Sequence, residues 1–376
     1  MECWSNLISI MHQNEISYAC GEWLLQKNTE VSAPVDLIRT VAIILVIIVH
    51  AAVEPHPIVQ VMDQAEVVRW FTVTTYDAFA AASVPLFVML SGALLLQPSK
   101  VEPLRVFLKK RALRLGLPFV FWGAAYFVWR FFVNHEVLTV SSVVQGILTG
   151  PYYHFWFLYM LAGLYLITPV LRVVTAHAER RILKYFLLIM LVGTAVVPLL
   201  VLVSGYGIAV TLFTVTGWIG YFVLGYYLLT TRVRSSILYV LYFVGFIGTI
   251  IGTYAATALV GGHTGLFFLD YLSATMILAS ASFFLILLKI SPTNIAARFP
   301  RGAKVLRFIG CSTLAIYLFH IMILESLQKG YFGFVISVNT INPIVEIPLI
   351  TVVTFLISIA IIFLLKKIPV VKRIIG

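Results

Sequence analysis

The sequence predicts an all-α polytopic membrane protein, a bundle of about ten transmembrane helices. Of its 376 residues, 61% are hydrophobic and only 11% are charged, and the mean hydropathy is +1.01. Soluble domains do not have this composition. Ten apolar runs also have about the 20 residues that a helix needs to cross the hydrocarbon core. These runs are 35–52, 78–96, 115–133, 155–174, 185–203, 209–229, 237–259, 266–288, 308–327 and 344–365.

The distribution of basic residues predicts the orientation of these helices. If the N-terminus is cytoplasmic, alternate loops hold nearly all of the Lys and Arg, and the opposite loops hold only Arg69 and Lys329. The positive-inside rule therefore predicts a multi-pass protein of the cell membrane with both termini in the cytoplasm. The net charge of +11 is then explained by cytoplasmic loops among membrane lipids, and no nucleic-acid partner is expected.

The chain divides into a cytosolic extension, residues 1–34, and one membrane domain, residues 35–376. The extension lacks the basic segment followed by an apolar stretch that marks a signal peptide. The three cysteines are far apart and match no metal or redox spacing. No metal and no tightly bound cofactor are expected.

The first apolar run carries Asp36, Arg39 and His50. A charged side chain near the middle of a bilayer costs about 3 kcal/mol or more. Arg39 and His50 are eleven residues apart, so on a helix they point the same way to within about 20° and lie about 16 Å apart. Snorkelling by Arg39 and simple packing of His50 are the alternatives, but both groups on one face favour a functional site.

Two further histidines are expected at the depth of His50, in the outer half of the bundle. His154 opens the fourth run beside Trp156, and His320 lies in the ninth run one turn from Tyr317. Imidazole is the side chain best suited to proton transfer near neutral pH. His154 could equally belong to an interfacial aromatic belt, and His320 could be a packing group.

Basic and small residues mark the predicted inner ends of the second and third runs. Arg111 and Arg114 are three residues apart and share a helical face. Guanidinium groups suit phosphate oxygens, although ordinary positive-inside charge is the simpler interpretation. Ser91 precedes Gly92, and small residues at such positions usually allow close helix packing.

Five stretches, taken together, resemble motifs of the membrane acyltransferase 3 family. They lie in the family's order and cover most of the chain. They are DLIRTVAIILVIIVHA at 36–51, VPLFVMLSGALL at 84–95, KKRALR at 109–114, YYHFWFLYMLAGLYLITPVL at 152–171 and GCSTLAIYLFH at 310–320. Within the family, the chain resembles stand-alone O-acetyltransferases of bacterial surface polysaccharides, such as the enterobacterial-common-antigen group.

This resemblance implies transfer of an acyl group, usually acetyl, from acyl-CoA to a hydroxyl of a surface or lipid-linked glycan. Acetyl-CoA would be a substrate rather than a bound cofactor. The implied roles are catalysis for His50, Arg39 and His320, donor binding for Arg111, Arg114 and Ser91, and acceptor binding for His154, Trp156, Asp36 and Tyr317.

A polysaccharide exporter or flippase without transferase activity is the alternative. Transporters typically carry internal repeats and broken helices, and the sequence shows no repeat. The acceptor, the acyl length and the oligomeric state stay open at this point.

Overall fold

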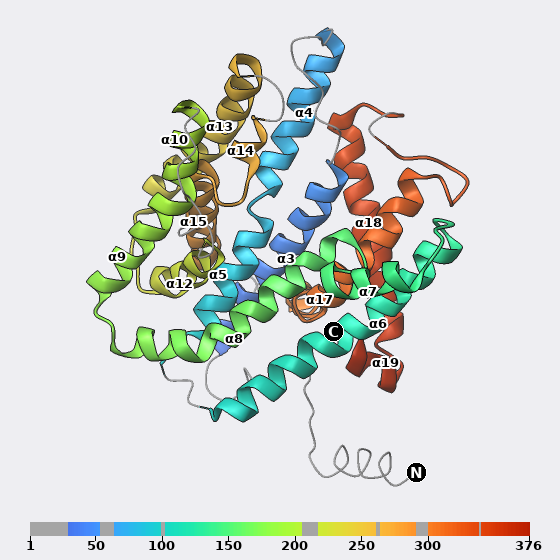
Figure 1. Ribbon diagram of the computed structural model, residues 1–376, viewed down its shortest axis with the longest axis horizontal. Helices are drawn as coiled ribbons and strands as arrows, with labels where there is room; N and C mark the ends of the chain where they lie inside the picture. The colour runs from blue at the N-terminus through green and yellow to red at the C-terminus, as the bar shows by residue number, and fades with distance from the viewer. Residues whose placement is uncertain are drawn as a thin grey trace.

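The computed structural model describes residues 29–52, 64–98, 102–204, 217–260, 264–290, 300–337 and 340–376 (Figure 1). These residues form helices joined by turns, without a strand among them. Within the described ranges, nine helical segments are long and apolar enough to cross a membrane, and α12 (Gly217–Leu229) is a shorter apolar helix. The predicted all-α polytopic fold is therefore confirmed.

The elements follow one another without long irregular segments in the described parts of the chain. Their bounds are α3 (Thr29–Ala51), α4 (Gln64–Ala80), α5 (Ser83–Leu95), α6 (Leu104–Phe132), α7 (Val140–Thr149), the 3₁₀ turn Tyr153–Phe155, α8 (Trp156–His177), α9 (Arg180–Leu191), the π turn Val192–Val196, α10 (Val197–Ser204), α12, α13 (Ser235–Leu259), α14 (Leu266–Leu269), α15 (Ala274–Lys289), α17 (Pro300–Gln328), α18 (Pro343–Leu365) and α19 (Pro369–Ile374).

Helix α3 lies at the centre of the bundle (Figure 1). It packs against α5, α15, α17 and α18, which approach it from different sides. Its Ile38, Ala42, Ile43 and Ile47 are completely buried. The polar groups of α3, Asp36, Arg39 and His50, are therefore held on a rigid central element.

Helices α5 and α12 approach each other so closely that glycine is required at two positions. A Cβ atom on Gly92 would overlap the backbone carbonyl of Phe222, and one on Gly225 would overlap the carbonyl of Met89. Small residues let membrane helices pack in this way. The small residue beside Ser91 thus has a packing role in the fold.

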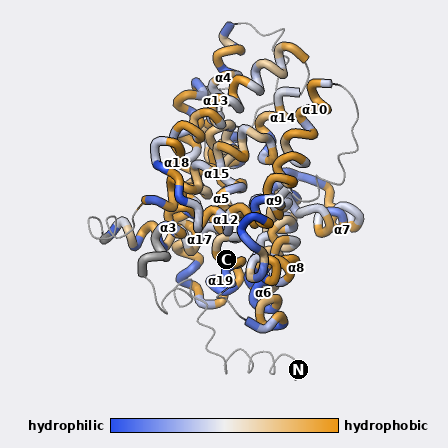
Figure 2. Tube along the Cα trace, turned by 90° about the vertical axis from the view of Figure 1, so that its left-hand side faces the viewer, coloured by the Kyte–Doolittle hydropathy of each residue, from blue (hydrophilic) through white to orange (hydrophobic). Residues whose placement is uncertain are grey.

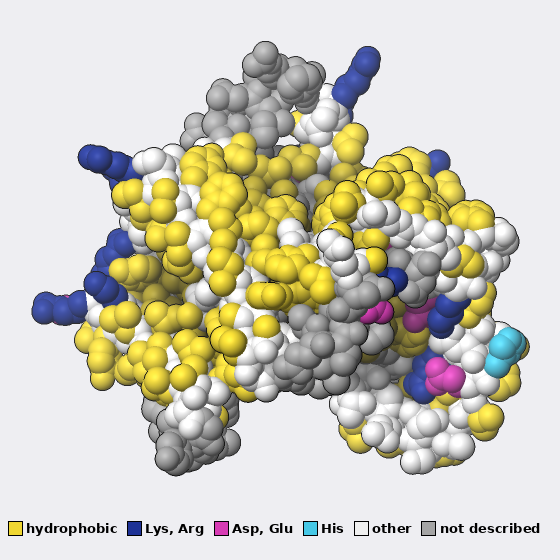
Figure 3. Space-filling model, turned by 90° about the horizontal axis from the view of Figure 1, so that it is seen from above, with side chains coloured by type: hydrophobic (Ala, Val, Ile, Leu, Met, Phe, Trp, Pro, Cys, Tyr) yellow, Lys and Arg dark blue, Asp and Glu magenta, His cyan; other side chains and the backbone are white. Residues whose placement is uncertain are grey.

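The surface of the bundle is apolar, as expected where lipid is the solvent. Figure 2 shows hydrophobic residues along most of the helices, with hydrophilic stretches near α6, α9 and α19. Hydrophobic side chains also cover much of the face in Figure 3. Val120 and Leu166, for example, are each 68% exposed. Apolar side chains on the outside of a membrane bundle contact lipid rather than water.

Helix α4 corrects one prediction from the sequence. Residues 64–77 were interpreted as a loop because they include Glu66, Arg69 and Asp77, yet they belong to α4. Trp70, Val73 and Ala78 are buried along one side of this helix. Their spacing of three to five residues places them on one apolar stripe of the helix. The charged residues hide this stripe when hydropathy is averaged over a window.

Other boundaries also differ from the expected ones. Helix α3 begins at Thr29, six residues before the predicted start, and α6 begins at Leu104 and includes the basic segment. Helix α7 occupies part of an expected loop and begins with a capping box between Thr139 and Ser142. Residues 1–28 of the expected extension and 209–216 of the sixth expected run lie outside the described residues.

Candidate functional site

The structure brings together the three histidines that the sequence placed at one depth. We call His50, His154 and His320 the histidine cluster. The ring centroid of His320 lies 5.3 Å from that of His50 and 5.9 Å from that of His154. His154 and His320 are fully buried, whereas His50 is partly exposed. His50 is therefore the member of the cluster that a substrate can reach most directly.

A backbone contact fixes the orientation of the His320 ring. Its Nδ1 lies 2.6 Å from the carbonyl oxygen of Tyr317. A carbonyl only accepts hydrogen bonds, so in the neutral ring Nδ1 carries the proton and Nε2 carries the lone pair. Nε2 is buried and has no hydrogen-bond partner among the described residues. This nitrogen is thus a proton acceptor whose hydrogen bond is unsatisfied.

Aromatic side chains surround the histidine cluster. The Tyr153 ring lies 5.4 Å from that of His50, in an edge-to-face arrangement. The Tyr317 hydroxyl donates to the His154 carbonyl at 2.5 Å. The Tyr126 ring lies 5.0 Å from that of His154. These rings make the surroundings of the imidazoles apolar, and a low dielectric strengthens any electrostatic interaction made there.

Glu325 holds the turn that carries Tyr153 and His154. Its carboxylate accepts a hydrogen bond from the Tyr152 hydroxyl and another from the Trp129 indole N–H, the latter at 3.2 Å. Lys329 completes the set with an ion pair at 3.4 Å. Helices α6 and α17 are thereby joined to the turn before α8, which fixes the backbone beside the histidine cluster.

A basic cluster lies toward the other end of α3. Its members are Arg39, Arg111, Arg114, Arg172 and Lys366, which are coupled electrostatically from one neighbour to the next. Two carboxylates lie among them. Asp36 is 3.9 Å from Arg39, and Glu102 is 3.8 Å from Arg172. The cluster keeps an excess of positive charge, as a site for a polyanion would require.

Aromatic rings and backbone carbonyls position the cations of the basic cluster. The Arg111 guanidinium lies 5.2 Å from the Phe107 ring centroid and 5.7 Å from that of Tyr165. Arg172 lies 4.6 Å from the Phe107 ring and donates to the Leu95 carbonyl at 2.7 Å. Cation–π contacts of this kind orient a guanidinium while leaving its N–H groups available.

Lys366 is the member of the basic cluster that can lose its charge. Its Nζ donates to the Cys311 carbonyl at 3.1 Å. Burial lowers the pKa of Lys366 from its usual 10.5 to about 8, and the nearby charges of Lys372 and Arg114 act in the same direction. Deprotonation near this pH would remove one positive charge from the cluster.

The Asp36 carboxylate occupies space that a glycine provides on α17. A Cβ atom on Gly310 would lie 2.6 Å from Asp36 Oδ1. Asp36 is only 6% exposed, and its nearest cationic partner is Arg39 on its own helix. The structure therefore places Asp36 in the basic cluster, away from the histidines with which the sequence grouped it as an acceptor-binding residue.

Trp156 and Ser91 lie outside both clusters. Trp156 is 36% exposed, and its ring packs beside Trp218 and Tyr271 instead of a histidine. The Ser91 hydroxyl donates to the Phe87 carbonyl of its own helix at 2.8 Å. Ser91 lies one turn before Leu95, whose carbonyl binds Arg172. Ser91 is therefore close to the basic cluster along α5, although its hydroxyl is hydrogen-bonded within its own helix.

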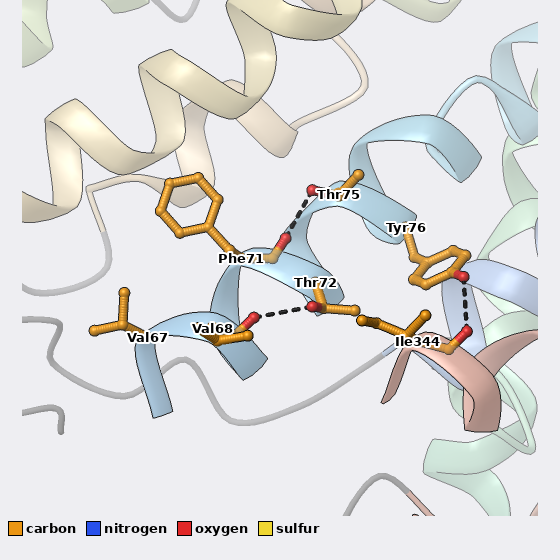
Figure 4. Close-up of a pocket in the computed structure, with 7 residues that line it drawn as sticks. All are labelled: Val67, Val68, Phe71, Thr72, Thr75, Tyr76 and Ile344. Atoms are coloured by element: carbon orange, nitrogen blue, oxygen red, sulfur yellow. Dashed lines mark hydrogen bonds between the residues drawn. The ribbon is translucent and has the colours of Figure 1, made fainter. Parts of the chain in front are cut away.

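An apolar groove of about 570 Å³ lies between α4 and the start of α18 (Figure 4). Its lining residues are Val67, Val68, Phe71, Thr72, Thr75, Tyr76 and Ile344. Each hydroxyl that lines it donates to a backbone carbonyl: Thr72 to Val68, Thr75 to Phe71 and Tyr76 to Ile344. The residues that line the groove therefore include no histidine, carboxylate or basic side chain.

Several site residues could not be identified from the sequence alone. Tyr126, Glu325 and Lys366 join the site through contacts with residues that are far away in the chain. Tyr153 differs from these residues, because its place next to His154 in the sequence could have identified it as a site residue. The contact between His50 and Tyr153 still required the relative placement of α3 and α8.

Comparison with known proteins identifies one family over most of the chain. Residues 33–363 match an acyltransferase domain, which covers α3 to α18 and includes both clusters apart from Lys366. No curated protein and no solved structure matches the chain. Since the domain match spans most of its length, the chain belongs to the membrane acyltransferase 3 family.

Proposed function

We propose that this membrane acyltransferase moves an acetyl group from acetyl-CoA to a hydroxyl of a cell-surface or lipid-linked glycan. One observation carries the proposal. A single buried helix, α3, presents Arg39 to the basic cluster and His50 to the histidine cluster. The separation of Arg39 and His50 along one helix suits a long donor with a polyanionic head and a reactive thioester.

The basic cluster is the proposed site for the phosphates of the donor. Arg111 and Arg114 share one face of α6, and Arg114 is exposed. Guanidinium groups form paired hydrogen bonds to phosphate oxygens. The pantetheine arm of CoA is long and flexible, so it can carry the thioester along α3 toward the histidine cluster.

His50 is the proposed general base at the other end of α3. It takes the proton of the acceptor hydroxyl while that oxygen attacks the thioester carbonyl. The new carbon–oxygen bond forms, the carbon–sulfur bond breaks, and the proton passes to the departing CoA sulfur. His320, whose ring lies next to His50, is the proposed second catalytic histidine, because its free Nε2 can accept or relay that proton.

The test is a comparison of purified wild-type protein with His50→Ala and His50→Gln. Positioned base catalysis is worth about 10²–10⁴ in rate, so both variants should lose turnover on that scale. Radiolabelled acetyl transfer to isolated surface glycan and release of free CoA are the two measurements. Glutamine can replace a hydrogen bond but cannot carry the proton, so its variant should be nearly as inactive as alanine. A His50→Gln variant with most of the wild-type rate would contradict the assignment.

The double variant Arg111→Lys, Arg114→Lys serves as the comparison within the same assay. Lysine keeps the charge but loses the forked geometry. We expect a higher apparent KM for acetyl-CoA, with kcat much less affected than in the His50 variants. Unchanged donor kinetics would instead assign these arginines to membrane orientation alone. If the protein releases no CoA but transports glycan across the membrane of reconstituted vesicles, it is an exporter and not a transferase.

A further inference from the structure

A second group of side chains lies beside the histidine cluster and has no role in the mechanism above. We call Trp156, Trp218 and Tyr271 the ring cluster. Their ring centroids are 5.7 Å apart for Trp156 and Trp218, 5.7 Å for Trp218 and Tyr271, and 6.1 Å for Trp156 and Tyr271. The three residues come from α8, α12 and the segment between α14 and α15.

The polar atoms of the ring cluster are available. The two indole N–H groups and the Tyr271 hydroxyl make no hydrogen bond to any described residue. Only the backbone of Tyr271 is engaged, since its carbonyl accepts a hydrogen bond from the Tyr221 hydroxyl at 2.6 Å. Trp156 is 36% exposed, and the other two rings are partly exposed. Tryptophan and tyrosine combine an apolar ring with a polar group that seeks a hydrogen-bond partner, so these partly exposed groups are available to a ligand.

Asp77 of α4 adds a carboxylate to this surface. It is close enough to act electrostatically on the Tyr271 hydroxyl. Among the described residues, no basic side chain and no hydrogen-bond donor pairs with its carboxylate. An ionisable group inside a membrane span without a partner is unusual and marks a functional site.

The ring cluster is joined to the histidine cluster by continuous ring contacts. The Trp156 ring lies 6.3 Å from that of Phe157, and Phe157 lies 5.1 Å from Tyr317. Tyr317 in turn lies 5.8 Å from His320. The ring cluster is therefore connected to the proposed reaction centre through two intervening rings, those of Phe157 and Tyr317.

We propose that the ring cluster and Asp77 form a carbohydrate subsite that holds one sugar ring of the acceptor. This inference rests on the proposed function, since it names where the acceptor glycan is recognised. The C–H faces of a pyranose pack on aromatic rings, and its hydroxyls donate to carboxylates and accept from indole N–H groups. An apolar surface with a few convergent polar groups is the usual composition of a small-molecule site.

The test is a binding measurement that requires no acyl transfer. Full-length protein in lipid nanodiscs would be mixed with methyl glycosides of glucose, galactose and N-acetylglucosamine, and saturation transfer from protein to sugar protons would be recorded by NMR. We expect transfer to at least one glycoside in the wild type. Trp218→Leu and Asp77→Asn should each weaken the binding of that glycoside by about fivefold or more.

Three further variants separate the subsite from general effects. Trp218→Phe keeps an aromatic face and should retain most binding, which shows that loss in Trp218→Leu is not misfolding. Gly163→Ala, on the same helix as Trp156, should bind sugar normally, because a Cβ atom there would meet nothing within 4 Å. Phe246→Leu changes another membrane aromatic cluster, with Phe79 and Tyr242, and should also bind normally.

Equal saturation transfer in the wild type, Trp218→Leu and Asp77→Asn would overturn the subsite and leave the rings as an interfacial aromatic belt. Wild-type protein that binds none of the three glycosides would overturn it as well. Neither result depends on CoA release, so failure of the subsite and failure of the proposed transferase are distinguished by separate measurements.

Discussion

Lys366 links the chemistry of the basic cluster to the pH of the solution. The pKa of this lysine is lowered to about 8, so the side chain is charged below that pH and neutral above it. If the basic cluster binds the phosphates of the donor, the apparent KM for acetyl-CoA should rise as the pH increases from 7 to 9. The loss of one charge–phosphate contact predicts a change of about threefold to tenfold.

Substitution at this position tests the assignment. Lys366→Arg keeps the charge over the whole pH range and should flatten the profile of KM against pH. Lys367→Arg is the matched control. Lys367 is the next residue in the chain, and its ammonium group lies over the Phe363 ring. This variant should leave the profile of KM against pH unchanged. A wild-type profile in the Lys366→Arg variant would show that this lysine does not contact the donor.

At the same scale, the sequence predicted the histidines better than their surroundings. Helical spacing and the predicted topology placed His50 and His320 at one depth, and the structure places their rings side by side. The contact of Glu325 with Tyr152 depends on how α17 meets the turn before α8. No local pattern encodes such a contact, because it follows from the packing of distant helices.

At the scale of the helix, the pair α5 and α12 provides a test of packing. Gly225→Ala introduces a methyl group against the Met89 carbonyl, and backbone cannot move aside as a flexible side chain can. Overpacking typically costs about 1–3 kcal/mol, and occasionally more. We expect a lower melting temperature in detergent and a smaller monodisperse fraction on size-exclusion chromatography.

Gly163→Ala is the control for this change. A Cβ atom on Gly163 would meet nothing within 4 Å, and alanine favours a helix by about 1 kcal/mol over glycine. This variant should therefore be as stable as the wild type or slightly more stable. Equal stability of Gly225→Ala and Gly163→Ala would contradict the close approach of α5 and α12.

Hydropathy predicted the existence of the helices more reliably than their ends. The spans are long apolar runs, and their length alone identifies them. Mean hydropathy predicts loops at α4 and α7, because Glu66, Arg69 and Asp77 lower the local mean and α7 has only ten residues. Buried contacts stabilise α4 and a capping box stabilises α7. Mean hydropathy over a window detects neither feature.

At the scale of the whole molecule, the orientation across the membrane stays a prediction from the basic residues. A reporter fused after Gly376 should be cytoplasmic. A tag inserted in the turn between α6 and α7, at residues 134–139, should be accessible from outside intact cells. Lys and Arg in short loops resist translocation, which is the physical reason for both expectations.

Protection of each tag from a membrane-impermeant label, before and after lysis, gives the measurement. A C-terminal reporter that is labelled in intact cells would reverse the proposed arrangement. The basic cluster would then face away from cytosolic CoA, and the route of the donor along α3 would have to be abandoned. Labelling of the inserted tag only after lysis would have the same consequence.

Because α3 is continuous, it fixes the distance between Arg39 and His50. Arg39 and His50 belong to one continuous helix, so eleven steps of the chain set their separation, at about 16 Å, and their common direction. No loop movement can change either quantity. A single residue inserted between them would turn the imidazole by about 100° away from its register with the guanidinium. The enzyme would thus select its donor by reach as well as by charge, and a donor whose arm is too short would be held at one end without being able to react at the other.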